Sequence, residues 1–310
     1  MGAATRDTFG EVIARVGEDP RVVVLTGDLR DSTRTEDFAE RFPDRFLECG
    51  IAESNMVGIA SGMALEGKVP WACSFSCFVT GRFETVRLSV AYQEANVRLV
   101  GTHTGVGVGE DGYSQMSLED IAMMRSLPNV AVINPADAVE TERAVEYLLD
   151  HQGPAFLRLT RQGVEDVNGE GYRFELGRAV TLRGGSDVAL VATGAPVGEA
   201  ARAAEALDGD GISASVLNVH TIAPIDEDAI RAAAASHRAV ITIEDHSVHG
   251  GLGGAVAEVL AAGNGSAAPL HRIGMRTFGE SGSPKELYAK YGLDAEGIAL
   301  TTAEFLKNLS

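Results

Sequence analysis

Cysteine is scarce in this 310-residue sequence, which contains only Cys49, Cys73 and Cys77. An odd number of cysteines in apolar stretches does not indicate the disulfide framework of a small secreted protein. We expect all three to be small buried hydrophobic residues of a protein in a reducing compartment, which favours the cytoplasm.

Basic residues are also few. The chain has 26 Lys and Arg against 44 Asp and Glu, a net charge of −18. A surface this acidic argues against nucleic acid and anionic membrane as partners, because both attract basic surfaces. The sequence lacks the run of about 18 apolar residues that a membrane span needs, and its start lacks a cationic segment followed by an apolar core. Any phosphate site would have to be a local cluster of basic residues.

The usual signatures of metal and nucleophile sites are missing too. Cys73 and Cys77 have no second pair, and His246 and His249 have no third ligand nearby in the sequence. Neither a G-x-S-x-G elbow nor a P-loop lysine motif occurs. We therefore predict no metal site in this chain.

Short β-branched runs alternate with longer helical stretches along the sequence. This alternation predicts an α/β fold with two domains, each a mostly parallel sheet with helices on both faces. The expected strands are 21–26, 98–101, 130–134, 155–159, 188–192, 214–218, 240–244 and 271–274, and the expected helices are 54–66, 136–149, 196–207, 227–235, 254–262 and 284–290. Around 162–174 the periodicity stops and Gly, Asn and charged residues take over, which indicates a linker. We place the domains at 1–170 and 180–310.

Two glycine-rich segments are candidates for ligand binding. GVGVGEDGYSQ at 105–115 lies between an expected strand and a helix that should begin near Ser117. Glycines after a strand let a ligand approach the backbone, but Glu110 and Asp111 would repel a pyrophosphate, so a dinucleotide site is not expected. HGGLGG at 249–254 precedes a helix, where it could bind an anion or allow close packing.

One acid stands out in LECGIAESNMVGIASGMALEG, residues 47–67. Glu53 lies between a predicted buried strand and a helix of small residues, and by itself it is a charge at a helix start. Its apolar neighbours Ile51, Met56 and Val57 predict burial, which disfavours the charged form of a carboxyl group.

Arg6, Ser32, His103 and Arg161 form a scattered polar set. The last three closely follow predicted strands, where an open α/β sheet binds its ligands. We therefore expect them to lie together.

Several motifs occur in a fixed order along nearly the whole chain. They are TGDLRDS (26–32), ECGIAESNMVGIASGMAL (48–65), SFSCF (74–78), THTGVGVGEDGYSQ (102–115), NPAD (134–137), GPAFLRLTRQ (153–162) and DVALVATGAPV (187–197). Their order and spacing resemble the C-terminal half of the transketolase family. The resemblance implies a pyrimidine-binding domain followed by a transketolase C-terminal domain, the smaller subunit of a split transketolase.

This resemblance implies a cofactor and a partner. Transketolases use thiamine diphosphate, and their N-terminal domain, which binds its diphosphate and Mg²⁺ through a Gly-Asp-Gly…Asn motif, is missing here. A partner subunit should supply it, in an α2β2 heterotetramer. The GDG at 209–211 has no Asn at the required distance, so we expect a turn there.

The resemblance also assigns roles to residues. Glu53 matches the glutamate that hydrogen-bonds N1′ of the cofactor's aminopyrimidine, and Phe75 and Phe78 match aromatic residues lining that ring. Arg6, Ser32, His103 and Arg161 match positions that hold a sugar phosphate. The implied catalytic residues are Glu53, His103, Asp111 and Gln115, with Asp111 contacting the acceptor's C2 hydroxyl.

Two positions depart from the family pattern. Gln115 replaces a histidine that contacts the donor, and glutamine can hydrogen-bond but cannot carry a charge or shuttle a proton. Gly81 replaces a tyrosine of the ring pocket, whose space Phe83 or the partner could fill.

The implied activity is transfer of a two-carbon ketol unit from a phosphorylated ketose to an aldose. The alternatives are the β subunit of a 2-oxoacid dehydrogenase, two-carbon transfer to a carrier-bound thiol, a deoxyxylulose phosphate synthase, or a non-catalytic binding partner. Gly58 and Gly62, in the helix after Glu53, each cost about 1 kcal/mol of helix propensity relative to Ala. We expect this helix at a subunit interface.

Overall fold

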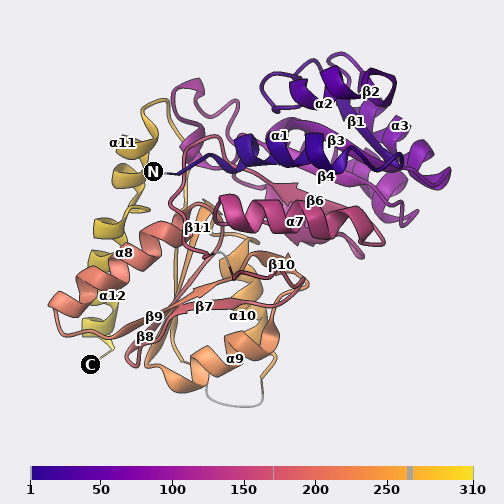
Figure 1. Cartoon of the computed structure of the whole chain (residues 1–310). Coiled ribbons are helices and arrows are strands. Elements are labelled where there is room, and N and C mark those ends of the chain that lie inside the picture. The colour runs from indigo at the N-terminus through magenta and orange to yellow at the C-terminus, as the bar shows by residue number, and fades with distance from the viewer. Residues whose placement is uncertain (1, 170, 264–267, 310) are drawn as a thin grey trace.

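The computed structural model describes residues 2–169, 171–263 and 268–309. Its strands form two sheets, and helices cover both faces of each (Figure 1). The predicted α/β class is therefore confirmed. Among the described helices, none has the length and hydrophobicity of a membrane-spanning segment.

The first sheet has seven strands in the order β10-β5-β6-β4-β3-β1-β2. All neighbours pair in parallel except β10 and β5. The strands are β1 (Val22–Thr26), β2 (Phe46–Glu48), β3 (Val69–Phe75), β4 (Arg98–Thr102), β5 (Ala131–Ile133), β6 (Ala155–Arg158) and β10 (Thr221–Ala223). Because β10 comes from the second half of the chain, the two halves share this sheet.

Alternating side chains of these strands enter two different cores. Val22 and Val24 of β1 pack with α1 (Thr5–Val16), α2 (Glu36–Arg41) and α7 (Ala138–Asp150). Val23 and Leu25 face the other side. The helical segments there are α3 (Glu53–Leu65), α4 (Ser76–Thr80), α5 (Phe83–Thr85), η2 (Val86–Ala91) and α6 (Asp120–Arg125). A strand buried on both faces shows as a continuous apolar run, which is why RVVVLT was recognisable in the sequence.

The second sheet has the order β12-β11-β8-β9-β7 and is parallel except for the β7–β9 pair. Its strands are β7 (Val180–Arg183), β8 (Val188–Ala192), β9 (Ala214–Asn218), β11 (Ala239–Ser247) and β12 (Leu270–Met275). One face packs on α8 (Pro196–Gly209), α11 (Pro284–Tyr291) and α12 (Ala295–Asn308), and the other on α9 (Glu227–Ser236) and α10 (Leu252–Ala261).

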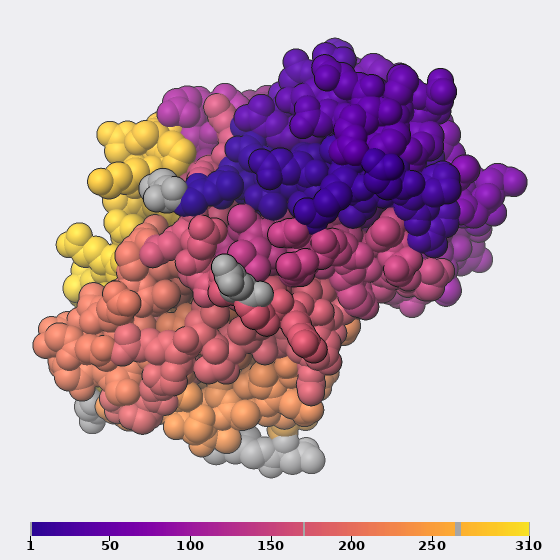
Figure 2. Space-filling view, in the orientation of Figure 1, coloured from indigo at the N-terminus to yellow at the C-terminus, as the bar shows by residue number. Residues whose placement is uncertain are grey.

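The two halves are in continuous contact across the face in Figure 2. A buried ion pair contributes to this junction, since Arg158 donates from Nε to Asp120 and from Nη2 to the carbonyl oxygen of Asp245. The halves are thus joined by main-chain pairing and by buried polar contacts.

Several local predictions were wrong. The segment at 46–48 is a partly exposed strand at the sheet edge, not a buried one, and Ile51 is 84% exposed. Cys73 is buried, but Cys49 and Cys77 are only partly so. The helix expected near Ser117 begins at Asp120. Where burial was overestimated, the apolar residue lies at a surface or turn that sequence pattern alone does not distinguish from a core.

Candidate active site

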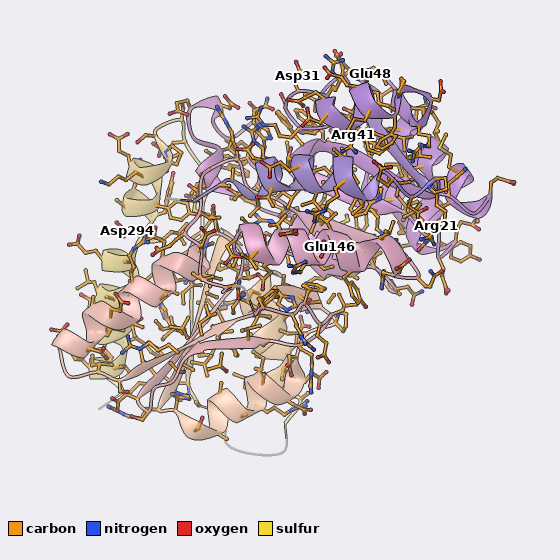
Figure 3. The ribbon with its side chains drawn as sticks, viewed as in Figure 1. Arg21, Asp31, Arg41, Glu48, Glu146 and Asp294 are labelled. Atoms are coloured by element: carbon orange, nitrogen blue, oxygen red, sulfur yellow. The ribbon has the colours of Figure 1, made fainter. Side chains whose placement is uncertain are left out.

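The carboxyl ends of the parallel strands β1, β3, β4 and β6 meet at one edge of the first sheet. Arg21 precedes β1 and Asp31 follows it, and the two lie far apart in Figure 3. Asp31 and Glu48 mark the carboxyl edge, where they line a cavity of about 380 Å³ together with Ser32. A parallel sheet presents its ligand site at this edge.

Glu53 is the first residue of α3, and its side chain is 4% exposed. Its Oε1 accepts a hydrogen bond from Ser74 Oγ at 3.1 Å. A Cβ on Gly27, directly after β1, would lie 3.2 Å from that oxygen, so the backbone there closely approaches the carboxyl group. Among the described residues, none donates to Oε2. A buried carboxyl group with one unused oxygen can bind a ring nitrogen.

Phe75 and Phe78 stack on each other, with ring centroids 5.4 Å apart. Phe75 ends β3 and Phe78 lies in α4, so the strand-to-helix turn brings the rings together. Phe75 also stacks on His103, with centroids 3.7 Å apart. Ser74 and Phe75 are the last two residues of β3, so the Glu53 carboxyl group and the stacked rings lie at the same carboxyl end of that strand.

His103 follows β4 with φ = 56°, an uncommon conformation for a residue that is not glycine. Arg6 Nη1 lies 3.0 Å from its Nε2, and Thr102 Oγ1 lies 2.9 Å from its Nδ1. Arginine can only donate, so Nε2 must accept and the neutral ring carries its proton on Nδ1. Burial, followed by the nearby guanidinium of Arg6, lowers the pKa of His103 to about 3.

Arg6 lies in the first turn of α1 and is largely buried. Its Nη1 also donates to the carbonyl oxygen of Ser32 at 3.2 Å. Its buried Nε has no hydrogen-bond partner, although it lies 3.5 Å from Asp7 Oδ1 in an ion pair. Burial lowers the pKa of Arg6, and the positive charges of Arg34 and Arg161 lower it further. The negative charge of Asp7 partly offsets this by raising the pKa. Clustered cations with an unused donor favour an anionic ligand.

Arg161 Nη1 donates to Asp111 Oδ2 and to the carbonyl oxygen of Val108, both at 2.9 Å. Asp111 ends η3 (Val106–Asp111), the helical turn within the glycine-rich segment. The structure therefore brings Arg6, His103, Arg161 and Asp111 into one cluster, and for His103 and Arg161 this follows from their positions after strands. Ser32 takes part through its carbonyl group.

Arg34 belongs to the same cluster and was missed in the sequence. It donates from Nε to Asp7 Oδ1 at 2.7 Å and contributes to the positive field at Arg6 and His103. Its position two residues after Ser32, on the loop that follows β1, was the available signal.

Gln115 is partly buried beyond η3, and its carbonyl oxygen lies 3.4 Å from Cys77 Sγ of α4. It therefore adjoins the helix that carries Phe78. Phe83 packs against the core beneath the first sheet, so its ring is already used there.

The other glycine-rich segments have structural explanations. Gly209 ends α8 and the next two residues form a turn, as expected. At 249–254 the carboxylate of Glu244 already accepts from the amides of Leu252 and Gly253, so this helix start is occupied from within the chain. Across the described residues, no group of His, Cys, Asp and Glu could hold a metal ion.

Two family models match consecutive parts of the chain. The transketolase pyrimidine-binding domain matches residues 1–166, and the transketolase C-terminal domain matches residues 177–298.

Similar curated proteins include two of nearly the same length. A putative transketolase C-terminal section from Methanocaldococcus jannaschii is 45% identical, with 97% of this chain and 96% of that protein covered. The 6-deoxy-6-sulfo-D-fructose transketolase subunit SqwH from a Clostridium species is 41% identical, with 96% and 93% covered. Human transketolase is 38% identical, and the chain spans only 48% of its length.

Solved structures agree with these relatives. A structure titled split gene transketolase, inactive beta4 tetramer, superposes with a TM-score of 0.91 at 40% identity, covering 99% of both chains. The transketolase from Leishmania mexicana superposes with a TM-score of 0.85 at 26% identity over 46% of that chain. The chain belongs to the transketolase family, whose enzymes depend on thiamine diphosphate, and is the smaller, C-terminal subunit of a split transketolase.

Proposed function

We propose that this chain and a partner subunit transfer a two-carbon ketol unit from a phosphorylated ketose to an aldose. The observation that carries the proposal is the cluster of Arg6, Arg34 and Arg161 around His103, next to the Phe75 ring and on the same sheet edge as Glu53. In a chain of net charge −18, such a cluster favours an anionic substrate.

The residues present fit thiamine diphosphate. A buried carboxyl group with an unused oxygen suits a ring nitrogen, and the stacked Phe75 and Phe78 rings suit the flat face of a pyrimidine. When bound, this cofactor supplies the nucleophile that opens the ketose C2–C3 bond. Glu53 holds and exchanges the proton at pyrimidine N1′, while Phe75 and Phe78 orient the ring and exclude water.

The sugar is held by the basic cluster. Arg6 and Arg161 donate to its phosphate, which the Ser32 loop also borders. Asp111 accepts from the acceptor's C2 hydroxyl, and Gln115 hydrogen-bonds the donor. Nε2 of His103 carries no proton while it accepts from Arg6 Nη1. After Arg6 moves to the phosphate, His103 donates to substrate from Nε2 only once the ring proton has passed from Nδ1 to Nε2, with Nδ1 then accepting from the Thr102 hydroxyl group.

The partner supplies the diphosphate site and Mg²⁺ through a true Gly-Asp-Gly…Asn motif, in an α2β2 heterotetramer in the cytoplasm. Two observations support this. The GDG at 209–211 is a helix end in a different domain from Glu53, and a structural relative is titled split gene transketolase, inactive beta4 tetramer. The full-length human relative is about twice as long as this chain.

A sulfonate has the same tetrahedral anionic oxygens as a phosphate. The relative from Clostridium is named for a sulfosugar, and one from Phocaeicola vulgatus, 38% identical, is named for apulose 4-phosphate. The basic cluster fits either head group. The relatives described above are transketolases or their subunits, which gives no support to the 2-oxoacid dehydrogenase or carrier-thiol alternatives.

Reconstitution tests the proposal. The chain is assayed alone and with a transketolase N-terminal subunit, using xylulose 5-phosphate, 6-deoxy-6-sulfofructose and unphosphorylated xylulose as donors and ribose 5-phosphate as acceptor. We expect turnover only with the partner and with kcat/KM highest for the phosphorylated donor. Turnover by the chain alone refutes the split-site arrangement. A higher kcat/KM for the sulfosugar than for xylulose 5-phosphate shows that the bound head group is a sulfonate and not a phosphate. A preference for unphosphorylated xylulose refutes the role of the basic cluster.

A further inference from the structure

The loop that carries Asp111 has little conformational preference of its own. Gly105 and Gly112, with φ of 73° and 76°, flank the six-residue η3, and Gly109 within it has φ of 83°. Glycine loses more conformational freedom on ordering than any other residue. Contacts from outside the loop must therefore hold Asp111 in place.

Asp245, in the second half of the chain, provides the first of these contacts. It lies near the end of β11 and is buried. Its Oδ1 accepts from the amide of Val106 at 2.8 Å and its Oδ2 from the amide of Gly107 at 3.4 Å. A Cβ on Gly105 would lie 2.0 Å from Oδ2, so only glycine lets the carboxylate come this close. Asp245 thus satisfies the first free amides of η3.

Tyr288 of α11 fixes that carboxylate in turn. Its hydroxyl donates to Asp245 Oδ2 at 2.9 Å, and the tyrosine is itself buried. The neighbouring segment adds two contacts to the same loop. Ser281 Oγ donates to the carbonyl oxygen of Glu110 at 2.6 Å, and the Phe278 ring lies 4.2 Å from that of Tyr113. Figure 1 shows α11 beside the purple loops of the first domain.

The far side of the loop contacts Arg161, a member of the basic cluster. Arg161 bonds both the Val108 carbonyl group and Asp111, so a shift of η3 would change the position of both charged groups. The following residue, Gln162, packs against Gly107, where a Cβ would lie 2.5 Å from its side-chain carbon. Loop and arginine are therefore held as one unit between the two sheets.

We propose that Asp245 and Tyr288 are positioning residues, through which the C-terminal domain sets the geometry of Asp111 and Arg161 in the substrate site. This inference rests on the proposed function for the part that concerns substrate. Neither side chain touches the substrate cluster, and both act through the amides of η3.

The first test uses the isolated chain and needs no activity. Tyr288→Phe removes one hydroxyl group, and Tyr291→Phe is the matched control, because Tyr291 lies on the same helix with a buried hydroxyl that has no hydrogen-bond partner among the described residues. We expect amide hydrogen exchange in residues 105–112 to quicken about 10-fold in Tyr288→Phe and to stay unchanged in Tyr291→Phe, with exchange of β8 unchanged in both. Equal exchange of the loop in both variants overturns the proposal.

The second test uses the complex reconstituted with the N-terminal subunit. Tyr288→Phe should raise KM for xylulose 5-phosphate about 3-fold to 30-fold with kcat nearly unchanged, and Tyr291→Phe should match the wild type. A lower kcat at unchanged KM overturns the positioning of Arg161. Where Tyr288→Phe does not fold, Ser281→Ala serves instead, with a smaller change in the same direction. Failure of the wild-type complex to turn over refutes the proposed function, while the exchange result still decides whether Asp245 and Tyr288 order the loop.

Discussion

Replacing Arg6 with glutamine tests the anion site most directly. Nη1 of Arg6 already bonds the Ser32 carbonyl group and His103, whereas the buried Nε has no hydrogen-bond partner. A phosphate should therefore gain at least one charge-assisted hydrogen bond, worth about 1.5–3 kcal/mol. At about 1.4 kcal/mol per factor of ten, Arg6→Gln should raise KM for xylulose 5-phosphate roughly 10-fold to 150-fold.

The assay is steady-state kinetics of the reconstituted complex with phosphorylated and unphosphorylated xylulose. The control is Arg15→Gln, which removes an exposed arginine of the same helix. We expect Arg6→Gln to raise KM only for the phosphorylated donor. An equal effect on both donors, or no effect on either, would refute the reasoning.

The same variant has a second readout, in the isolated chain. Burial is the main cause that lowers the pKa of His103 to about 3, and the positive charge of Arg6 is the next largest cause. Without the guanidinium group, this pKa should rise part of the way towards the ordinary value of about 6.5, measured by NMR titration of the ring protons. An unchanged histidine pKa would contradict the contact with Arg6.

Three further predictions concern other parts of the chain. Glu53→Gln should lower kcat of the reconstituted complex about 10²-fold to 10⁴-fold, the range of positioned proton transfer, and unchanged turnover would revive a non-catalytic role. Burial raises the pKa of Glu140 from 4.5 to about 7, so the stability linked to its protonation is fully present below pH 4.5 and is lost as pH rises through 7. In urea unfolding, the free energy of unfolding of the wild type should therefore fall by up to about 3 kcal/mol relative to that of Glu140→Gln as pH rises across that interval. Free energies of unfolding that change in parallel with pH in the two proteins would contradict this. Gly62→Arg should leave the isolated chain folded, since a Cβ there meets nothing within 4 Å. It should weaken assembly with the partner, measured by size-exclusion chromatography. Normal assembly of this variant would exclude α3 from the interface.

The site illustrates how far sequence reasoning reached. His103 and Arg161 were predicted to lie together because each follows a parallel strand, and the structure shows them in one cluster. Arg34 was missed because a charged residue on a loop has the same sequence signature as an ordinary surface residue. Ser32 was expected for its side chain, but its carbonyl group makes the contact with Arg6.

Long-range contacts account for the other differences. HGGLGG left anion binding and packing open, and the carboxylate of Glu244, from the preceding strand, occupies the amides concerned. β10 was not predicted, because three residues carry too little periodicity and its pairing partner β5 lies far away in the sequence.

The sequence by itself determined the alternation of strand and helix, the position of Glu53 at the start of α3, and the family to which the motifs belong. These follow from local spacing, because side-chain periodicity and motif order are properties of neighbouring residues. Only the tertiary structure decided that His103 accepts from Arg6 and that Asp245 and Tyr288 hold the loop of Asp111. Those contacts join residues far apart in the chain, and folding of the two sheets against each other brings them within hydrogen-bonding distance.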